Sequence, residues 1–334
     1  MEKNAAMRSL PVFEGVTFRH FAGRSDYPHF ARIITANARG EGHDRVETPE
    51  QLGSAYDHLQ RCDPRRDLVV AEVGGTPVAY SRLWWDPEPD GAHVYRQVCF
   101  VDPDFGSRGI GGALFIWNEE RLREVASEHE APERRLEIYA NDRNEGLTGL
   151  VHRHGYEEDT YFAEMVRPSL DDLPDHRLPD GLEIRPVTED QVRTIWEADV
   201  EAARDHWGFV EPTEADYQRF LEFPYLDTSL WKVAWDAEGV VGQVKSFIDT
   251  AQNEEHGRRR GWTEAISTAR RWRRRGVAKA LIVESIRELA GRGMTEVALG
   301  VHTQNPHGAY ELYAGLGYEV VSSWTSYRKP LRVS

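Results

Sequence analysis

The amino-acid sequence predicts an α/β protein that consists of two tandem domains with the same plan. The main reason is a pattern that occurs twice: a strand-like run, a glycine loop with arginine, and an amphipathic helix, at 96–125 and again at 262–289. The length agrees, because 334 residues at roughly 150 per domain gives two domains. We place the first domain at 1–168, a proline-containing acidic linker at 169–180, and the second domain at 181–334.

The two halves correspond element by element along the chain. In each half an early strand precedes the repeated pattern, a further strand follows its helix, and a short Arg/Lys-Pro segment ends the half. The matched pairs, first half before second, are 68–73 with 230–235, 96–103 with 262–268, 106–111 with 273–278, 112–125 with 279–289, 136–139 with 297–301, and 165–168 with 327–330.

The loop at 273–278 has the features of an anion-binding site. A strand that turns through small residues into a helix leaves backbone N–H groups free at the helix start. The following helix has one apolar stripe, which includes Leu281, Ile286 and Leu289. Arginines in the same turn add charge and reach, which suits a diphosphate that carries a further phosphate.

Two motifs in order resemble the GCN5-related N-acetyltransferase (GNAT) superfamily. The sequence Arg-x-x-Gly-x-Ala at 273–278 resembles the superfamily's acyl-CoA loop, Gln/Arg-x-x-Gly-x-Gly/Ala. Downstream, Asn305 and the segment Leu-Tyr-x-x-Leu-Gly-Tyr at 312–318 resemble its Asn…Leu-Tyr-x-x-Leu-Gly-Phe/Tyr segment. The resemblance implies two tandem GNAT domains, each a mixed, mostly antiparallel sheet flanked by helices, with a splayed strand pair that holds acyl-CoA.

The resemblance also implies acetyl-CoA as the acyl donor, with no metal. The superfamily binds pantetheine along the splayed strand, the diphosphate on the loop, and the pantetheine arm again through an asparagine. Carried onto this sequence, the expected cofactor-binding residues are Ile266, Ser267, Thr268, Arg271, Arg273, Arg274, Arg275, Gly276, Val277, Ala278, Lys279, Asn305 and Tyr310.

Two residues are candidates for the chemistry. An amine must lose a proton before or during its attack on a thioester, and Glu264, on the splayed strand, is the candidate base. Asp249 and Glu254, near the end of the preceding strand, are its rivals, and an ordinary solvated glutamate is the plain alternative. Tyr313 matches the superfamily's tyrosine that protonates the departing thiolate, whereas helical spacing alone would make it a core residue.

The acceptor pocket is expected within 198–225, where the first two helices of the second domain should meet the cofactor cleft. Aromatic side chains beside a glycine turn form a wall there, although an ordinary helix–helix core would look the same. The candidate acceptor residues are His206, Trp207, Phe209, Asp249 and His302.

The first domain departs from the superfamily pattern at three positions. Gly106 matches Arg273, Val151 matches Tyr313, and Gln97 matches Glu264 when the halves are aligned on their glycines. We therefore expect a structural first domain without catalysis. Residual contacts to CoA would come from Val101, Arg108, Gly109 and Gly111.

Composition limits the other possibilities. A formal net charge of −15 argues against a nucleic-acid or anionic-membrane binder, although the arginine run 270–275 alone could be an RNA-binding patch. Gly109-x-Gly111 lacks the third glycine of a dinucleotide fingerprint. No apolar run approaches the ~20 residues of a membrane span, residues 1–7 lack a signal-peptide core, and two cysteines suit a reducing cytoplasm.

We therefore expect an N-acetyltransferase that moves an acetyl group from acetyl-CoA to a primary amine of a small molecule. A degenerate first domain before an active second one resembles tandem superfamily members that acetylate a cysteinyl amine. A protein N-acetyltransferase and a non-catalytic acyl-CoA sensor are the alternatives. The sequence leaves the acceptor, the acyl-chain preference and the oligomeric state open.

Overall fold

The computed structural model describes residues 10–332, so the prediction about a signal peptide at 1–7 lies outside the described residues. The chain forms two compact units. Unit 1 combines the chain up to Asp159 with the chain from Trp324 onward, and unit 2 is Thr160–Ser323. Each unit is a mixed, mostly antiparallel sheet flanked by helices, as predicted.

Unit 1 has a six-stranded sheet in which only β4 and β5 are parallel neighbours. Its strands, in sheet order, are β1 (Val16–His20), β2 (Leu68–Val73), β3 (Thr76–Pro87), β4 (His93–Val101), β5 (Arg134–Asn141) and β12 (Glu319–Pro330). Its helices are α1 (Tyr27–Gly40), α2 (Pro49–Tyr56), α3 (Pro64–Asp67), α4 (Ile110–Ser127) and α5 (Glu145–Arg153).

Unit 2 repeats this plan, and β10 and β11 are its parallel pair. Its strands, in sheet order, are β6 (Glu157–Arg167), β11 (Glu296–His302), β10 (Arg260–Thr268), β9 (Val240–Phe247), β8 (Lys232–Trp235) and β7 (Glu183–Arg185). Its helices are α6 (Val192–Ala203), α7 (Glu214–Leu221), α8 (Thr250–His256), α9 (Val277–Gly291) and α10 (Ala309–Ala314).

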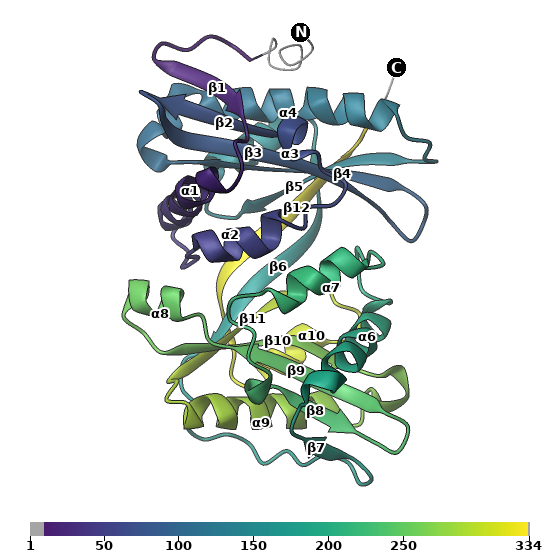
Figure 1. The fold of residues 1–334 in the computed structure, drawn as a ribbon. Helices are drawn as coiled ribbons and strands as arrows, with labels where there is room; N and C mark the ends of the chain where they lie inside the picture. Colours follow the sequence, from purple (N-terminus) through teal and green to yellow (C-terminus); the bar gives the residue numbers. More distant parts are fainter. Residues whose placement is uncertain (1–9, 333–334) are drawn as a thin grey trace. The chain divides into compact units, whose positions relative to one another are not determined.

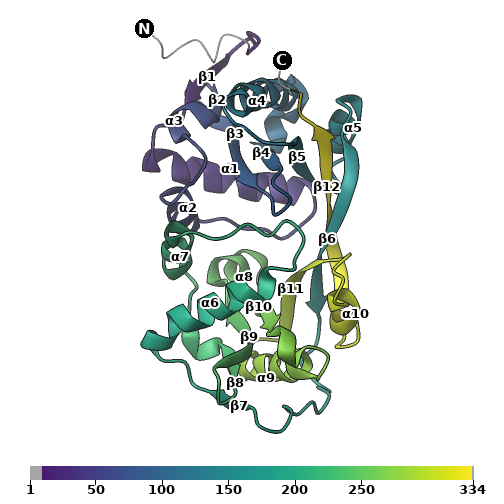
Figure 2. The same ribbon diagram turned by 90° about the vertical axis from the view of Figure 1, so that its right-hand side faces the viewer.

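Strand periodicity explains why each sheet has a helix layer on both faces. Side chains alternate between the faces, so successive buried residues enter different cores. In unit 2, Ala234 packs with Leu281 of α9 on one face, and Val233 packs with Ile195 of α6 on the other. The ribbon of unit 2 likewise has its sheet between α9 and the α6–α7 layer (Figures 1 and 2).

The last strand of each sequence half belongs to the other unit, which corrects the predicted boundaries. β6 was placed in the first domain but pairs with β11, and β12 was placed in the second but pairs with β5. The predicted linker 169–180 therefore joins β6 to β7 inside unit 2, and Leu170, Leu173 and Leu178 pack on that unit's core. The repeated order of elements that the sequence predicts is present in the structure. Equivalent strands are exchanged between the two halves of the sequence, however, and residue patterns alone do not reveal such an exchange.

Among residues 10–332, no helix is both long and apolar enough to cross a bilayer. No group of three or more His, Cys, Asp or Glu side chains in the same range could hold a metal ion.

Candidate active site

Strand β10 loses its regular pairing on both edges where the site begins. On one edge, its parallel pairing with β11 covers Arg260 to Trp262 and then stops. On the other edge, Glu264 to Ser267 lies opposite only Lys245 to Gln243 of β9, which is a β-bulge of one extra residue. The bulge includes Ala265 with φ +47°, a left-handed conformation that is uncommon for a residue other than glycine. The strand therefore leaves its neighbour and exposes main chain to a cavity.

The loop after β10 turns into α9 at a glycine. Gly276 has φ +87° and precedes the first residue of the helix, and no side chain caps the free N–H groups there. A side chain is strained at this φ, whereas glycine is not. The predicted strand–loop–helix is thus present, with the positive end of the α9 dipole directed at the loop.

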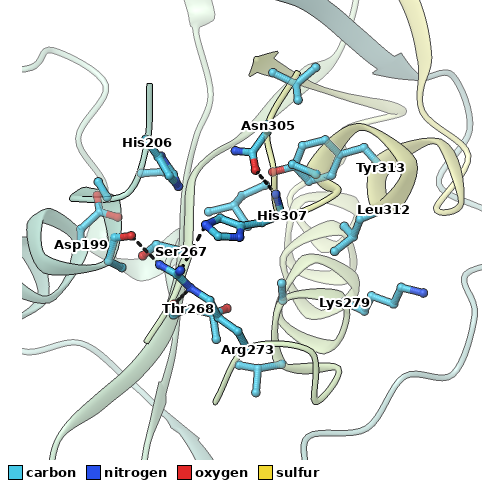
Figure 3. Close-up of a pocket in the computed structure, with 18 of the residues that line it drawn as sticks. Asp199, His206, Ser267, Thr268, Arg273, Lys279, Asn305, His307, Leu312 and Tyr313 are labelled. Carbon is cyan, nitrogen blue, oxygen red and sulfur yellow. Dashed lines mark hydrogen bonds between the residues drawn. The ribbon is translucent and has the colours of Figure 1, made fainter. Parts of the chain in front are cut away.

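A cavity of about 690 Å³ extends from this loop along β10 to α10. Figure 3 shows Arg273 at one end, Asn305 and Tyr313 at the other, and Asp199 and His206 at the side. The predicted site residues that line it are Glu264, Ile266, Ser267, Thr268, Arg273, Arg274, Gly276, Val277, Ala278, Lys279, Asn305, Tyr313, His206 and His302. The predicted residues that do not line it are Arg271, Arg275, Tyr310, Trp207, Phe209 and Asp249.

The arginines of the loop have partners within the protein. Arg273 donates to Asp205 at 2.9 Å and to the main-chain oxygen of Ala202 at 2.8 Å. Arg271 contacts the Asp236 carboxylate at 2.9 Å, so it faces away from the cavity. Arg275 likewise lies outside, with its guanidinium 4.8 Å from the Trp272 ring. These contacts fix the loop, and Arg274 and Lys279, which are both exposed, are among the residues that line the cavity.

The predicted base lies where the two parallel strands separate. The Glu264 carboxylate accepts a hydrogen bond of 2.8 Å from the backbone N–H of Gly300 in β11. Burial raises the pKa of Glu264 to about 7, and the nearby Glu164 carboxylate adds to the increase while the Gly300 N–H opposes it. A carboxyl group with this pKa is partly ionised at neutral pH and can accept a proton there. The rival Glu254 is exposed on α8, and Asp249 caps that helix by accepting from Gln252 N–H at 2.8 Å.

The predicted acid is buried and lines the same cavity. Tyr313 lies on α10, and burial, with a smaller contribution from Glu264, raises the pKa of its phenol. Its hydroxyl has no hydrogen-bond partner among residues 10–332, so it is available to a bound molecule. A phenol with a raised pKa keeps its proton at neutral pH and can donate it.

Three other predicted residues have structural surroundings. Trp207 packs its ring on Phe162 and His302, with centroids 5.7 Å apart in both cases. Phe209 lies under the Arg204 guanidinium at 5.7 Å. Tyr310 packs against the core of unit 2. In contrast, Asn305 lines the cavity, and its side-chain oxygen accepts from the His307 N–H at 2.8 Å.

The sequence prediction missed a second cavity, of about 300 Å³, that adjoins the first. Asp199 and Ala265 line both cavities. Most of its other lining residues are aromatic, and three of them, Phe220, Phe223 and Tyr225, lie inside the segment 198–225 where an acceptor pocket was expected. Residues of the segment 198–225 therefore line a cavity, and their role in binding an acceptor stays a prediction.

Unit 1 has the same loop geometry without the same surroundings. Gly109 has φ +77° and starts α4, as Gly276 starts α9. The Arg108 guanidinium lies 5.1 Å from the Phe105 ring. A Cβ on Gly111 would lie 3.4 Å from the Val101 side chain, so the strand packs closely on the helix start. Whether these residues bind CoA stays a prediction.

The bulge corrects one of the predicted equivalences. Strand β4 pairs with β3 with no register shift, so β10 has one residue more than β4 ahead of the loop. Gln97 matches Glu264 only when residues are counted back from the loop glycines without this extra residue. With the bulge included, Val98 takes the position of Glu264, and Gln97 matches Thr263.

Hydrogen bonds support the corrected alignment. Gln97 donates to the Tyr156 hydroxyl at 3.1 Å, and the Thr263 hydroxyl lies 2.8 Å from the hydroxyl of Tyr318, the matching tyrosine. Unit 1 therefore has Val98 where unit 2 has the candidate base, Glu264. Val151, in the position of Tyr313, is fully buried.

A splayed strand pair, a glycine loop at a helix start, and a carboxylate and a tyrosine on one cavity define a class: acyltransferases that use a CoA thioester. Residues 36–156 and 192–318 both match the acetyltransferase (GNAT) family. The chain belongs to this family.

Curated relatives of this chain are called mycothiol acetyltransferase. The protein from Saccharomonospora viridis is 28% identical over 303 residues, which cover 88% of this chain and 92% of the relative. The protein from Frankia casuarinae is 27% identical over 252 residues, 73% of this chain and 69% of the relative. For the protein from Geodermatophilus obscurus, identity is 26% over 180 residues, and the match spans about half the length of that relative, 54%.

Solved structures share the fold over nearly the whole chain. A GCN5-related N-acetyltransferase from Sphaerobacter thermophilus has a TM-score of 0.71 at 24% identity, covering 96% of this chain and 98% of that one. A tandem GNAT protein from the clavulanic acid biosynthesis pathway has a TM-score of 0.66 at 17% identity, covering 96% and 99%. At these identities the likeness concerns the fold alone.

Proposed function

We propose that unit 2 transfers an acetyl group from acetyl-CoA to the primary amine of a small molecule. The observation that carries the proposal is that Glu264, with its pKa raised to about 7, and Tyr313, with an unpartnered hydroxyl, line one cavity beside the α9 loop. A site that needs one base and one acid near neutral pH would have these properties.

The donor would bind with its phosphates at the loop and its thioester between the two catalytic groups. Free N–H groups at the start of α9 and the exposed Arg274 and Lys279 suit the diphosphate. The main chain of the bulge, from Ala265 to Ser267, would run along the pantetheine arm, and Asn305 would contact the same arm from the other side.

In the reaction, Glu264 would take a proton from the acceptor's ammonium group, directly or through a water molecule. The free amine would attack the thioester carbonyl carbon, forming the C–N bond while the C–S bond breaks. As the amide forms, the second amine proton would pass to solvent, and Tyr313 would donate its phenolic proton to the departing CoA sulfur and regain a proton from solvent afterwards. The products are an amide and CoA.

The relatives' name, mycothiol acetyltransferase, supports a small-molecule acceptor, and the cysteinyl amine expected from the sequence stays a candidate within that class. The cavity beside the loop is lined by residues of β10, α6 and α10, and it would have room for a small amine beside the thioester.

Replacing Tyr313 by Phe tests the assignment of unit 2. The ring is kept and only the proton donor is lost, so we expect kcat to fall about 10²-fold while acetyl-CoA affinity stays within about twofold. The measurement is CoA release from acetyl-CoA at saturating concentrations with a panel of primary amines, alongside calorimetric titration of CoA. Equal kcat for the two proteins, or no CoA release with any amine, would contradict the proposal.

A further inference from the structure

The second cavity of unit 2 lies next to the candidate base and could hold the part of an acceptor that does not react. Its walls are mainly aromatic: Trp196, Phe220, Phe223, Tyr225, Trp231 and Phe247. Several of the rings pack edge to face, with Phe223 5.7 Å from Tyr225 and 5.2 Å from Phe247. At about 300 Å³ the cavity has room for one ring system with a short chain, and not for a folded peptide.

Strand pairing places this cavity on the face that carries Glu264. Residues directly opposite in an antiparallel pair point to the same face, and Glu264 pairs with Lys245 while Trp262 pairs with Phe247. Lys245 and Phe247 line the aromatic cavity, and Ala265, next to Glu264, lines both cavities. An amine at the Glu264 carboxylate could therefore extend its remaining atoms into the aromatic cavity.

Among residues 10–332, the charged side chains that line the aromatic cavity are Lys245 and Asp199, and their charges neutralise one another. Lys245 is buried, with 8% of its side chain exposed, and its ammonium lies 2.7 Å from the Asp199 carboxylate. The same ammonium lies 5.0 Å from the centre of the Phe220 ring, so the wall already holds a cation over an aromatic face. A ligand carboxylate would compete with Asp199 for Lys245, and a second ligand cation would compete with Lys245 for Asp199. The site thus favours a neutral occupant.

We infer that the aromatic cavity binds the non-reacting body of the acceptor, and that this body is a neutral, planar apolar group, so that the acceptor is an arylalkylamine. The inference rests on the proposed acetyl transfer and narrows its acceptor class. A polyhydroxylated body would place hydroxyl groups against ring faces, which accept only weak hydrogen bonds, and this is unfavourable because those groups lose water on entry. An aromatic body loses ordered water and gains ring contacts.

The test compares kcat/KM for 2-phenylethylamine, ethylamine and glucosamine at saturating acetyl-CoA in the full-length protein. We expect 2-phenylethylamine to exceed each of the others by at least about tenfold, because even one methylene in an apolar pocket discriminates about 10–200-fold. Phe223→Ala should raise KM for 2-phenylethylamine about tenfold, with kcat and the constants for ethylamine nearly unchanged. Phe223→Leu, which keeps an apolar side chain, should lose less and covers the case in which the alanine variant folds poorly.

The matched control is Phe209→Leu, because Phe209 is an aromatic residue in the same region that lines neither cavity. Its constants should match those of the unmodified protein. Preference for glucosamine, or an equal effect of Phe223→Ala on all three amines, would overturn the inference while CoA release still supported acetyl transfer. Absence of CoA release with every amine would overturn the proposed function itself.

Discussion

The two units share the loop and differ at the strand ahead of it. Both loops end in a left-handed glycine, Gly109 or Gly276, at the start of a long helix. Both units also close a short helix with the same bond, since Tyr156 N–H donates to Val151 O and Tyr318 N–H to Tyr313 O, at 3.1 Å each. The architecture that presents an anion site is therefore common to both.

Strands β4 and β10 differ by a single residue, which is inserted in β10. In unit 2 the bulge after Glu264 releases the main chain and leaves the carboxylate between separating strands. In unit 1 the strand has no bulge, and its parallel pairing with β5 continues to Gln97, one position beyond the end of the pairing in unit 2. The Gln97 amide is fully engaged, because it accepts from Asn118 at 2.9 Å and donates to Tyr156.

Because of this difference, the two units share the loop and the fold but differ at the candidate catalytic positions. A loop that could hold a diphosphate is present twice, but a cavity with an ionisable carboxylate and a free phenol is described in unit 2. In unit 1 the matching positions hold two valines, Val98 in place of Glu264 and the buried Val151 in place of Tyr313, and a hydrogen-bonded amide network around Gln97 lies next to Val98. We therefore still expect unit 1 to keep the fold without catalysis.

The largest expected effect comes from placing a charge at the two loop glycines in turn. Gly276→Asp puts a carboxylate at the start of α9, where it would repel the diphosphate, so we expect acetyl-CoA affinity to fall more than 10²-fold by calorimetry. Gly276→Asn is the control, because it introduces the same left-handed strain, at φ +87°, with no charge. Gly109→Asp should leave affinity and kcat within about twofold, and a large loss there would show a working cofactor site in unit 1.

The next effect concerns the base and its pH dependence. Glu264→Gln keeps an oxygen that accepts from Gly300 N–H but cannot take a proton, so kcat should fall about 10²–10⁴-fold. In the unmodified protein the pKa of Glu264 is raised to about 7 by burial, and the base is active only when ionised. Activity should therefore fall as pH decreases through 7 and approach about a tenfold loss per pH unit below 6. A pH profile of kcat/KM with no limb near 7, or a Gln variant with the same limb, would exclude Glu264 as the base.

The sequence was sufficient for features that depend on local pattern. The strand, glycine loop and helix at 262–289 and the tyrosine of 312–318 are local in the chain, and each requirement, such as a glycine at φ +87°, selects a residue type. The doubled plan was equally visible because its elements recur in one order. Most of the residues expected along the donor cavity do line it.

The rest depended on contacts that sequence position does not encode. Strand exchange was invisible because β6 and β12 are equivalent and would fit either sheet. The β-bulge could not be predicted, because one extra residue in a strand does not disturb the alternation of Glu264, Ile266 and Thr268 in the sequence. Which arginines face the cavity was decided by distant carboxylates: Asp236 holds Arg271 away from it. The aromatic cavity is lined by residues of α6, α7, β9 and β10 and of the chain between α7 and β8, and these residues lie far apart in the sequence.

The smallest expected effect tests whether the amide network of unit 1 is structural. Gln97→Leu keeps the size of the side chain but removes the acceptor of the Asn118 amide and one of the two partners of the Tyr156 hydroxyl, the other being Glu119, in a fully buried setting. Unsatisfied buried groups of this kind cost about 1–3 kcal/mol, so the urea midpoint of the unfolding step that reports on unit 1 should fall. Thr263→Val, at the matching position of unit 2, removes one hydroxyl and should cost about 1 kcal/mol in the step that reports on that unit. Because two units need not unfold together, hydrogen exchange of β4 and β10 should be followed separately.

The Gln97→Leu protein should retain kcat within about twofold at temperatures where it is folded, since the network contacts no residue of the donor cavity. A tenfold loss of kcat with native circular dichroism would mean that unit 1 takes part in the reaction, and the division of roles between the two units would have to be abandoned.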